Sequence, residues 1–202
     1  MSISHESFLL ASILTGYPDQ NFSGVIKNFP GTPSLEKLKG DYIDLFDKNP
    51  NSPSLYETAY GRDQFTKTQT LSDILGFYHA FGFELGQKDK LKEMGDHLSV
   101  ELEFYALLVM KQKTLKETQK KEGAEIVLDA RKKFLKDHLG KFIQCISEHP
   151  TIKVHPFYGP LLEECKDLIA LECQSLGVVP EYSFGVLTQP EVDHEVHCPS
   201  TV

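Results

Sequence analysis

The chain has 202 residues, which is enough for one large domain or two small ones, and such a chain can bury about 70% of its unfolded surface. Its composition is 40% hydrophobic and 25% charged, as in ordinary soluble globular proteins, and no run approaches the roughly 18 apolar residues of a membrane span. The formal net charge of −8 disfavours nucleic acid as a partner, because phosphate binding needs a basic surface. A cationic partner is favoured instead.

Two features predict a reducing, cytoplasmic setting. The first residues, MSISHESFLLASILTGYP, lack a basic leading region and a small-residue cleavage site, and their apolar run ends at Gly16 and Pro18. We interpret this stretch as a first helix. The cysteines have spacings typical of neither a metal clip nor a disulfide framework, and they are Cys145, Cys165, Cys173 and Cys198.

Apolar residues recur at helical spacing along most of the chain, and no stretch shows the sustained alternation typical of strands. The predicted helices, in chain order, cover residues 1–16, 35–46, 71–81, 97–109, 128–146 and 158–169. This pattern predicts an all-α, bundle-like domain over residues 1–180. Residues 181–202 have no helical period and are expected to form a partly unstructured tail.

Start and stop signals refine these boundaries. Thr32, followed by Pro33 at the first helical position, is the expected cap of helix 35–46. Thr70 is the expected cap of helix 71–81, which ends at Gly82. Gly76 inside that helix costs about 1 kcal/mol relative to alanine, so we expect a close packing contact there.

Two segments are expected to interrupt the helices. The charged stretch 111–125, around Gly123, predicts a break after the fourth helix. The segment SEHPTIKVHP, residues 147–156, has two prolines before the last helix. It is either an ordered turn or a hinge that lets two copies exchange their last helix, so a monomer and a homodimer are both compatible with the sequence.

An acid and an imidazole are adjacent at the start of the fourth helix, where Asp96 and His97 precede Glu101 and Glu103. The doublet could be an acid–base pair, a pair of metal ligands or a helix cap. Capping by the aspartate would contribute about 1 kcal/mol. It would leave His97, Glu101 and Glu103 unexplained.

A second doublet, Asp137–His138, lies inside a predicted helix, where sequence neighbours point about 100° apart. That spacing disfavours a catalytic dyad that lines one pocket. Together the two doublets suggest a metal-dependent hydrolase only weakly, because the chain has no HxxxH or HxxE spacing.

The tail contains a group of possible metal ligands: Asp193, His194, Glu195, His197 and Cys198. A flexible tail loses entropy when it binds a metal, so we expect adventitious binding or none. The chain also has no phosphate loop, dinucleotide fingerprint or nucleophile elbow. We therefore predict no metal, no cofactor and no enzymatic activity.

Aromatic residues gather before and within the two central predicted helices. They are Tyr56, Tyr60, Tyr78, Phe81, Phe83, Phe104 and Tyr105. Several must belong to the core. Their proximity in sequence to Glu57, Glu101 and Glu103 also describes a groove with apolar walls and an acidic rim, which suits a peptide that carries arginines and leucines.

Several stretches resemble the TorD/DmsD/NarJ family of redox-enzyme maturation chaperones. GDHLSVELEFYALLV at 95–109 resembles the acidic signature of that family, and SDILGFYHAFGFEL at 72–85 is similar to its preceding helix. DHLGKFI at 137–143 and HPFYGPLLEE at 155–164 resemble its later helices. The family usually has methionine or another aliphatic residue where this chain has Tyr105, and often a proline where it has Met94–Gly95.

The resemblance implies an all-helical cytoplasmic chaperone. Such a protein binds the twin-arginine signal peptide of a molybdopterin oxidoreductase, and sometimes its apoenzyme, until the cofactor is inserted. The signal-peptide-binding residues expected from the resemblance and the groove hypothesis are Tyr56, Glu57, Tyr60, Tyr78, Phe81, Gly82, Asp96, His97, Glu101, Glu103 and Phe104. On this hypothesis Asp96, Glu101 and Glu103 pair with the arginines. The alternatives are a nucleotide-binding protein, a metal-dependent hydrolase and an oligomeric scaffold.

Overall fold

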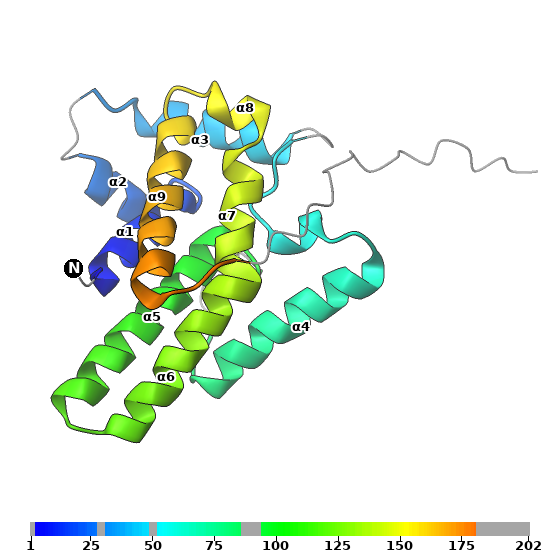
Figure 1. Ribbon diagram of the computed structural model, residues 1–202. Coiled ribbons are helices and arrows are strands. Elements are labelled where there is room, and N and C mark those ends of the chain that lie inside the picture. The colour runs from blue at the N-terminus through cyan, green and yellow to red at the C-terminus, as the bar shows by residue number, and fades with distance from the viewer. Residues whose placement is uncertain (1–2, 28–30, 49–51, 86–93, 181–202) are drawn as a thin grey trace, which may run out of the picture.

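The computed structural model describes residues 3–27, 31–48, 52–85 and 94–180, and every regular element in these ranges is helical (Figure 1). Within the same ranges the only pairing of the β type is an isolated antiparallel bridge between Tyr56 and His97. The all-α prediction is confirmed. None of the helices in these ranges is both long and apolar enough to span a bilayer.

The helices are α1 (His5–Thr15), α2 (Gln20–Ile26), α3 (Leu35–Tyr42), α4 (Gln64–Ala80), α5 (Leu98–Glu117), α6 (Lys121–Phe134), α7 (Gly140–Ser147), α8 (Pro150–Lys153) and α9 (Tyr158–Leu176). Three short turns join them: π-helical η1 (Ile43–Asp47), 3₁₀-helical η2 (Glu57–Tyr60) and π-helical η3 (Leu135–Leu139).

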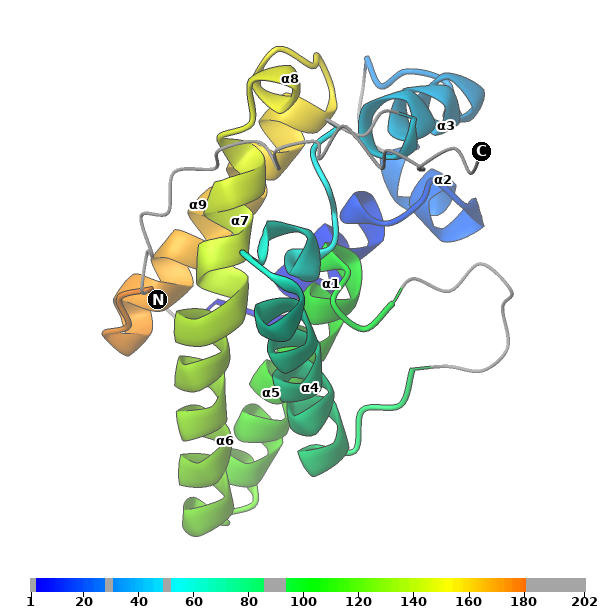
Figure 2. The ribbon, with the colours of Figure 1, turned by 90° about the vertical axis from the view of Figure 1, so that its right-hand side faces the viewer.

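The long pair of α5 and α6 is the centre of the fold. Helix α1 packs on α5, and α9 packs on α7 and touches α1. Figure 2 shows α6, η3 and α7 as one continuous rod, with α4 alongside the α5–α6 pair. Helix α4 is thus an outer element that covers the centre from one side.

Several predicted boundaries need correction, because local caps act where the apolar stripe gives no signal. Helix α3 begins after Ser34, whose hydroxyl accepts the Lys37 N–H, and not after Thr32. Helix α4 begins after Asp63, whose carboxylate accepts the Thr66 N–H, and not at Thr70.

The predicted break after the fourth helix does lie within the charged stretch 111–125, but it is much shorter than that stretch. Helix α5 continues to Glu117, the chain reverses at residues 118–120 with Gln119 at a φ of 58°, and Gly123 lies inside α6. Charged side chains can occupy the outer faces of two long helices, so a run of charge alone does not end a helix. Helix α9 stops at Gly177 as expected, in the left-handed conformation that glycine favours.

Helix α2 was not predicted, because it is short and contains Gly24. It is capped by Asp19, and it buries Phe22 and Ile26 against Leu38 in a small cluster of their own. Helix α8 lies inside the segment 147–156, so this link has an ordered turn. Exchange of α9 across it stays a prediction, and the tail at 181–202 lies outside the described residues.

A buried polar network joins three helices in the core. The Tyr105 hydroxyl on α5 donates to a Glu172 carboxylate oxygen on α9 at 2.8 Å, and Arg131 on α6 pairs with the same carboxylate. The Arg131 guanidinium also donates to Gln112 on α5. Breaking such a pair leaves an uncompensated buried charge. The unusual Tyr105 therefore has a structural role that an aliphatic residue could not fill.

Gly76 does not make the close contact expected of it. A methyl group added at its Cα would meet nothing within 4 Å, whereas one added at Gly140 would lie 2.4 Å from the Leu135 carbonyl oxygen. The glycine instead leaves open the face of α4 on which it lies.

Gly76→Ala should therefore raise the free energy of unfolding by about 1 kcal/mol, because alanine restores helix propensity without a clash. Gly140→Ala should lower it. Urea denaturation followed by circular dichroism measures both. A destabilised Gly76→Ala variant would show that a contact exists at this position.

Candidate binding groove

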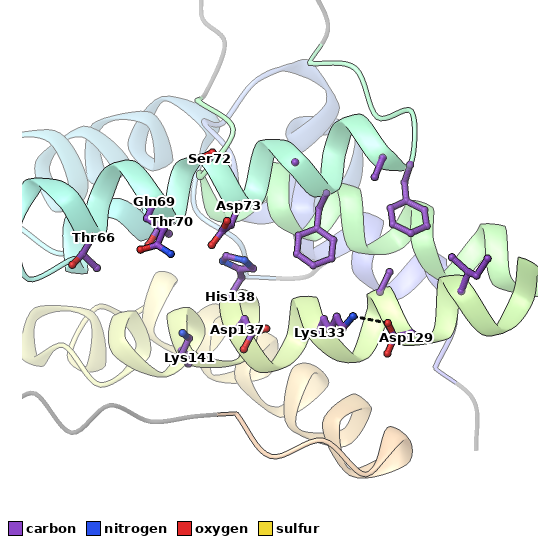
Figure 3. Close-up of a pocket in the computed structure, with 16 residues that line it drawn as sticks. Thr66, Gln69, Thr70, Ser72, Asp73, Asp129, Lys133, Asp137, His138 and Lys141 are labelled. Carbon is purple, nitrogen blue, oxygen red and sulfur yellow. Dashed lines mark ion pairs between the residues drawn. The ribbon is translucent and has the colours of Figure 1, made fainter.

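A groove of about 740 Å³ lies between α4 on one side and the rod of α6, η3 and α7 on the other (Figure 3). Its two ends differ in chemistry. The apolar end is lined by Gly76, Phe77, Ala80, Phe81, Ile126 and Ala130, with the Asp129–Lys133 ion pair beside them. The polar end is lined by Thr66, Gln69, Thr70, Asp73, Asp137, His138 and Lys141.

Aromatic rings and small residues together create this hollow. Phe77 rests on Phe134 with ring centroids 5.4 Å apart, and Tyr78 rests on Phe104 at 4.7 Å. These large rings support α4 from below. Above them the groove is lined by small residues such as Ala80 and Ala130, which do not fill the space between the helices.

The π-helical turn η3 brings both Asp137 and His138 to the groove. The expectation that these neighbours cannot line one pocket is therefore wrong. It assumed regular α-helical geometry, and a π turn changes the angle between successive side chains. Turns of this kind are frequent at functional sites. In Figure 3, Asp73 on α4 projects toward His138 across the groove.

His138 connects the groove to the core. Its Nδ1 lies 3.2 Å from the Glu57 Oε2, and both side chains are at most one-tenth exposed. Glu57 begins η2, which lies beside α4. The ring of His138 therefore separates the groove from an acidic group behind it.

Behind Glu57 lies Glu101, which is completely buried on α5. Its two carboxyl oxygens have no hydrogen-bond partner among the described residues. Burial, followed by the charges of Glu57 and Asp96, raises the pKa of Glu101 well above its usual value. A fully buried carboxyl group without a donor is costly to ionise, so Glu101 keeps its proton.

Asp96 fixes the segment that contains Glu57. Its Oδ2 accepts the Thr58 hydroxyl at 2.6 Å and the Thr58 N–H at 3.2 Å, while its backbone carbonyl accepts the Glu57 N–H at 2.9 Å. The Leu98 N–H donates to the Leu55 carbonyl oxygen at 2.8 Å. Residues 55–58 therefore form a strap across the start of α5.

His97, and not Asp96, caps α5. Its Nδ1 accepts the Ser99 N–H at 3.2 Å, and its Nε2 lies 3.2 Å from the Tyr42 hydroxyl. Burial lowers the pKa of His97 to about 3. The imidazole is therefore neutral at physiological pH and serves as a capping acceptor.

The structure separates the predicted site residues into buried and accessible ones. Fully buried are Tyr78, Asp96, His97, Glu101 and Phe104. Partly buried are Tyr56, Glu57, Tyr60 and Phe81, and exposed are Gly82 and Glu103. Of all these, Phe81 lines the groove. Glu101 was expected in an accessible acidic rim, Asp96 as a partner of the arginines, and Tyr78 and Phe104 as walls of the groove. These expectations are corrected, because the four side chains are buried beneath the strap and α4.

The groove residues were missed, although one signal was present in the sequence. Thr66, Thr70, Asp73, Phe77 and Ala80 recur every three or four residues along α4 and form a second face beside the apolar stripe. Within the described ranges no three His, Cys, Asp or Glu side chains are grouped as metal ligands. The ligand-rich group at 193–198 lies outside these ranges.

Comparisons with known proteins agree with this architecture. A family model described as nitrate reductase delta subunit matches residues 19–147. A crystal structure from Archaeoglobus fulgidus, described as a redox enzyme maturation protein, is 20% identical, with a TM-score of 0.52 over 84% of this chain and 96% of that chain. At that identity the likeness shows a shared fold. No curated protein matches the chain.

Glu101→Gln should stabilise the protein, and increasingly so as the pH rises. The unfolded carboxyl ionises near 4.5 while the buried one keeps its proton, so the wild type loses up to about 1.4 kcal/mol per pH unit between 4.5 and the raised pKa. Glutamine removes that loss. Urea denaturation at several pH values between 4 and 9 measures how the free energy of unfolding changes with pH, and the exposed Glu125→Gln is the matched control. Equal slopes in wild type and Glu101→Gln would contradict the buried proton.

His97→Asn should reduce the acid sensitivity of folding. The unfolded imidazole gains a proton below pH 6.5, whereas the buried ring resists protonation down to about pH 3, so stability present above 6.5 is lost as the pH falls. Asparagine keeps the cap acceptor without titrating. The slope of stability against pH between 3.5 and 6.5 is the quantity to compare, with the exposed His79→Asn as control. An unchanged slope would refute the assignment.

Proposed function

The chain belongs to the NarJ/TorD-type chaperone family whose model is described as nitrate reductase delta subunit, and we propose that it binds the twin-arginine leader of a molybdopterin oxidoreductase in the groove beside α4. In this role it is a redox-enzyme maturation chaperone. It holds the leader, and through it the apoenzyme, in the cytoplasm until the cofactor is inserted. Catalysis is not part of this function.

The groove itself is the observation that carries the proposal. A leader peptide has apolar residues after its arginines, and the groove offers an apolar end formed by Phe77, Phe81 and Ile126. Ile126 is 57% exposed, although it is a large apolar side chain. Covering such residues on a partner is favourable by about 25 cal/mol per Å² of apolar surface. Peptides commonly bind helical proteins in grooves of this kind.

Apolar contact rather than charge should supply most of the affinity. Exposed ion pairs contribute only about 0.2 to 1 kcal/mol each, so charged groups mainly set register and partner choice. Asp96 and Glu101 are buried and cannot meet the arginines directly. The accessible acids of the groove, Asp73 and Asp137, are the candidates for that contact.

A side chain introduced at Gly76 tests the proposal, because Gly76 lines the groove and a Cβ added there would meet no other atom within 4 Å. Gly76→Leu should weaken leader binding at least tenfold, since the leucine occupies the volume that the peptide needs. Gly40→Leu is the matched control, since Gly40 lies on an exposed side of α3 with equally open space. Titration calorimetry with the synthetic leader of the oxidoreductase encoded nearest in the genome measures the affinity.

The outcomes separate the location of the site from the function. Unchanged affinity in a folded Gly76→Leu variant would place the leader elsewhere on the molecule. A stable wild-type protein that binds no twin-arginine leader would refute the function itself. Gly76→Ala should bind almost normally, because a methyl group fills little of the groove.

A further inference from the structure

We infer that Phe65, at the start of α4, extends the groove by one further contact, which takes an apolar side chain of the leader that precedes its arginines. The inference rests on the proposed function and deepens it. It adds an apolar contact on the far side of the polar end of the groove, and it states which part of the leader lies there.

Phe65 lies on the same face of α4 as three residues that line the groove. It precedes Gln69 by four residues, Ser72 by seven and Gly76 by eleven, and α-helical residues at these separations share one face. The next residue, Thr66, lies at the end of the row of α4 side chains that Figure 3 shows along the groove. Phe65 therefore continues this wall of the groove beyond its polar end.

Folding does not use the ring of Phe65. The side chain is 76% exposed, more than any other phenylalanine or tyrosine in the described ranges, and it belongs to neither hydrophobic cluster. Single exposed apolar residues are common on protein surfaces and carry no meaning alone. Val154 is of this kind, since it is 80% exposed at the end of α8, which does not line the groove. Phe65 differs because it lies in line with the groove.

The groove wall that α4 provides therefore changes from apolar to polar and back to apolar. Phe65 is followed by a polar stretch that includes Thr70 and Asp73, and then by Phe77. Phe77 comes twelve residues after Phe65, which corresponds to about 18 Å along the helix axis. A peptide that covers this distance matches the wall when it has apolar side chains on both sides of its polar segment.

The order of residues in a twin-arginine leader sets its direction along this wall. In the proposed complex, the apolar residues that follow the arginines meet Phe77 and Phe81, and the arginines face Asp73. The leader residues that precede the arginines then run toward the start of α4. Apolar surface covers an exposed phenyl ring favourably, so an apolar side chain in this part of the leader contacts Phe65.

Calorimetry with two peptides tests this contact. The first is the full leader of the oxidoreductase encoded nearest in the genome, and the second is the same peptide, acetylated, without the residues that precede the arginines. Phe65→Ser should weaken binding of the full leader about tenfold, because the ring no longer buries apolar surface. Wild type and Phe65→Ser should bind the shortened peptide equally.

Two controls and a scan complete the experiment. Val154→Ser should bind both peptides as the wild type does, and Phe65→Ser should unfold at the wild-type urea concentration, because both side chains are exposed. Leucine is then introduced in turn at each leader position before the arginines. At one position it should raise the affinity for wild-type protein and leave the affinity for Phe65→Ser unchanged.

The possible results distinguish the contact from the function. Unchanged affinity of Phe65→Ser for the full leader would overturn the inference. An equal loss of affinity for both peptides would also overturn it, since Phe65 would then contact the arginines or the residues after them. A wild-type dimer that Phe65→Ser does not form, measured by sedimentation without peptide, would overturn it in favour of a second copy of the chain. Wild-type protein that binds neither peptide would instead refute the proposed function.

Discussion

A carboxyl group with no cation to balance its charge lies at the centre of this molecule, and the surrounding structure is arranged around it. Glu101 is completely buried, so it must keep a proton or meet a compensating charge. It keeps the proton, because burial raises its pKa well above the usual value. The strap at 55–58 is pinned to the start of α5 by Asp96, which fixes Glu57 and thereby positions His138 at the floor of the groove.

The start of α5 combines two buried groups that respond to pH in opposite directions. Glu101 costs stability as the pH rises above 4.5, and His97 costs stability as the pH falls below 6.5. Between these values the unfolded chain has gained a proton at one group and lost one at the other. The two slopes cancel there, so these residues make stability least sensitive to pH between about 4.5 and 6.5.

The long apolar stripes sufficed to predict the main helices, because burial of one face decides where a helix of several turns forms. Local details did not follow from the stripes. Asp63 begins α4 well before its apolar residues, and the π turn at 135–139 follows an unbroken stripe that looks α-helical in sequence. The network of Tyr105, Arg131 and Glu172 joins residues far apart in the chain, and a single sequence holds no signal for such a contact.

The burial of the predicted site residues also could not be predicted from the sequence. The pattern of polar residues along a helix predicts that charged side chains such as Asp96 and Glu101 face solvent. That prediction fails here, because a separate strap covers both side chains. The resemblance in residues 95–109 singles out a stretch of sequence, but it does not say whether its side chains touch a ligand or hold the residues that do. In this fold Asp96 holds the strap that positions His138, while Asp73 and Gly76 of α4 and Phe81 at its end line the groove. In the proposed binding groove, specificity for the peptide can therefore change through residues of α4 while the buried acids stay the same.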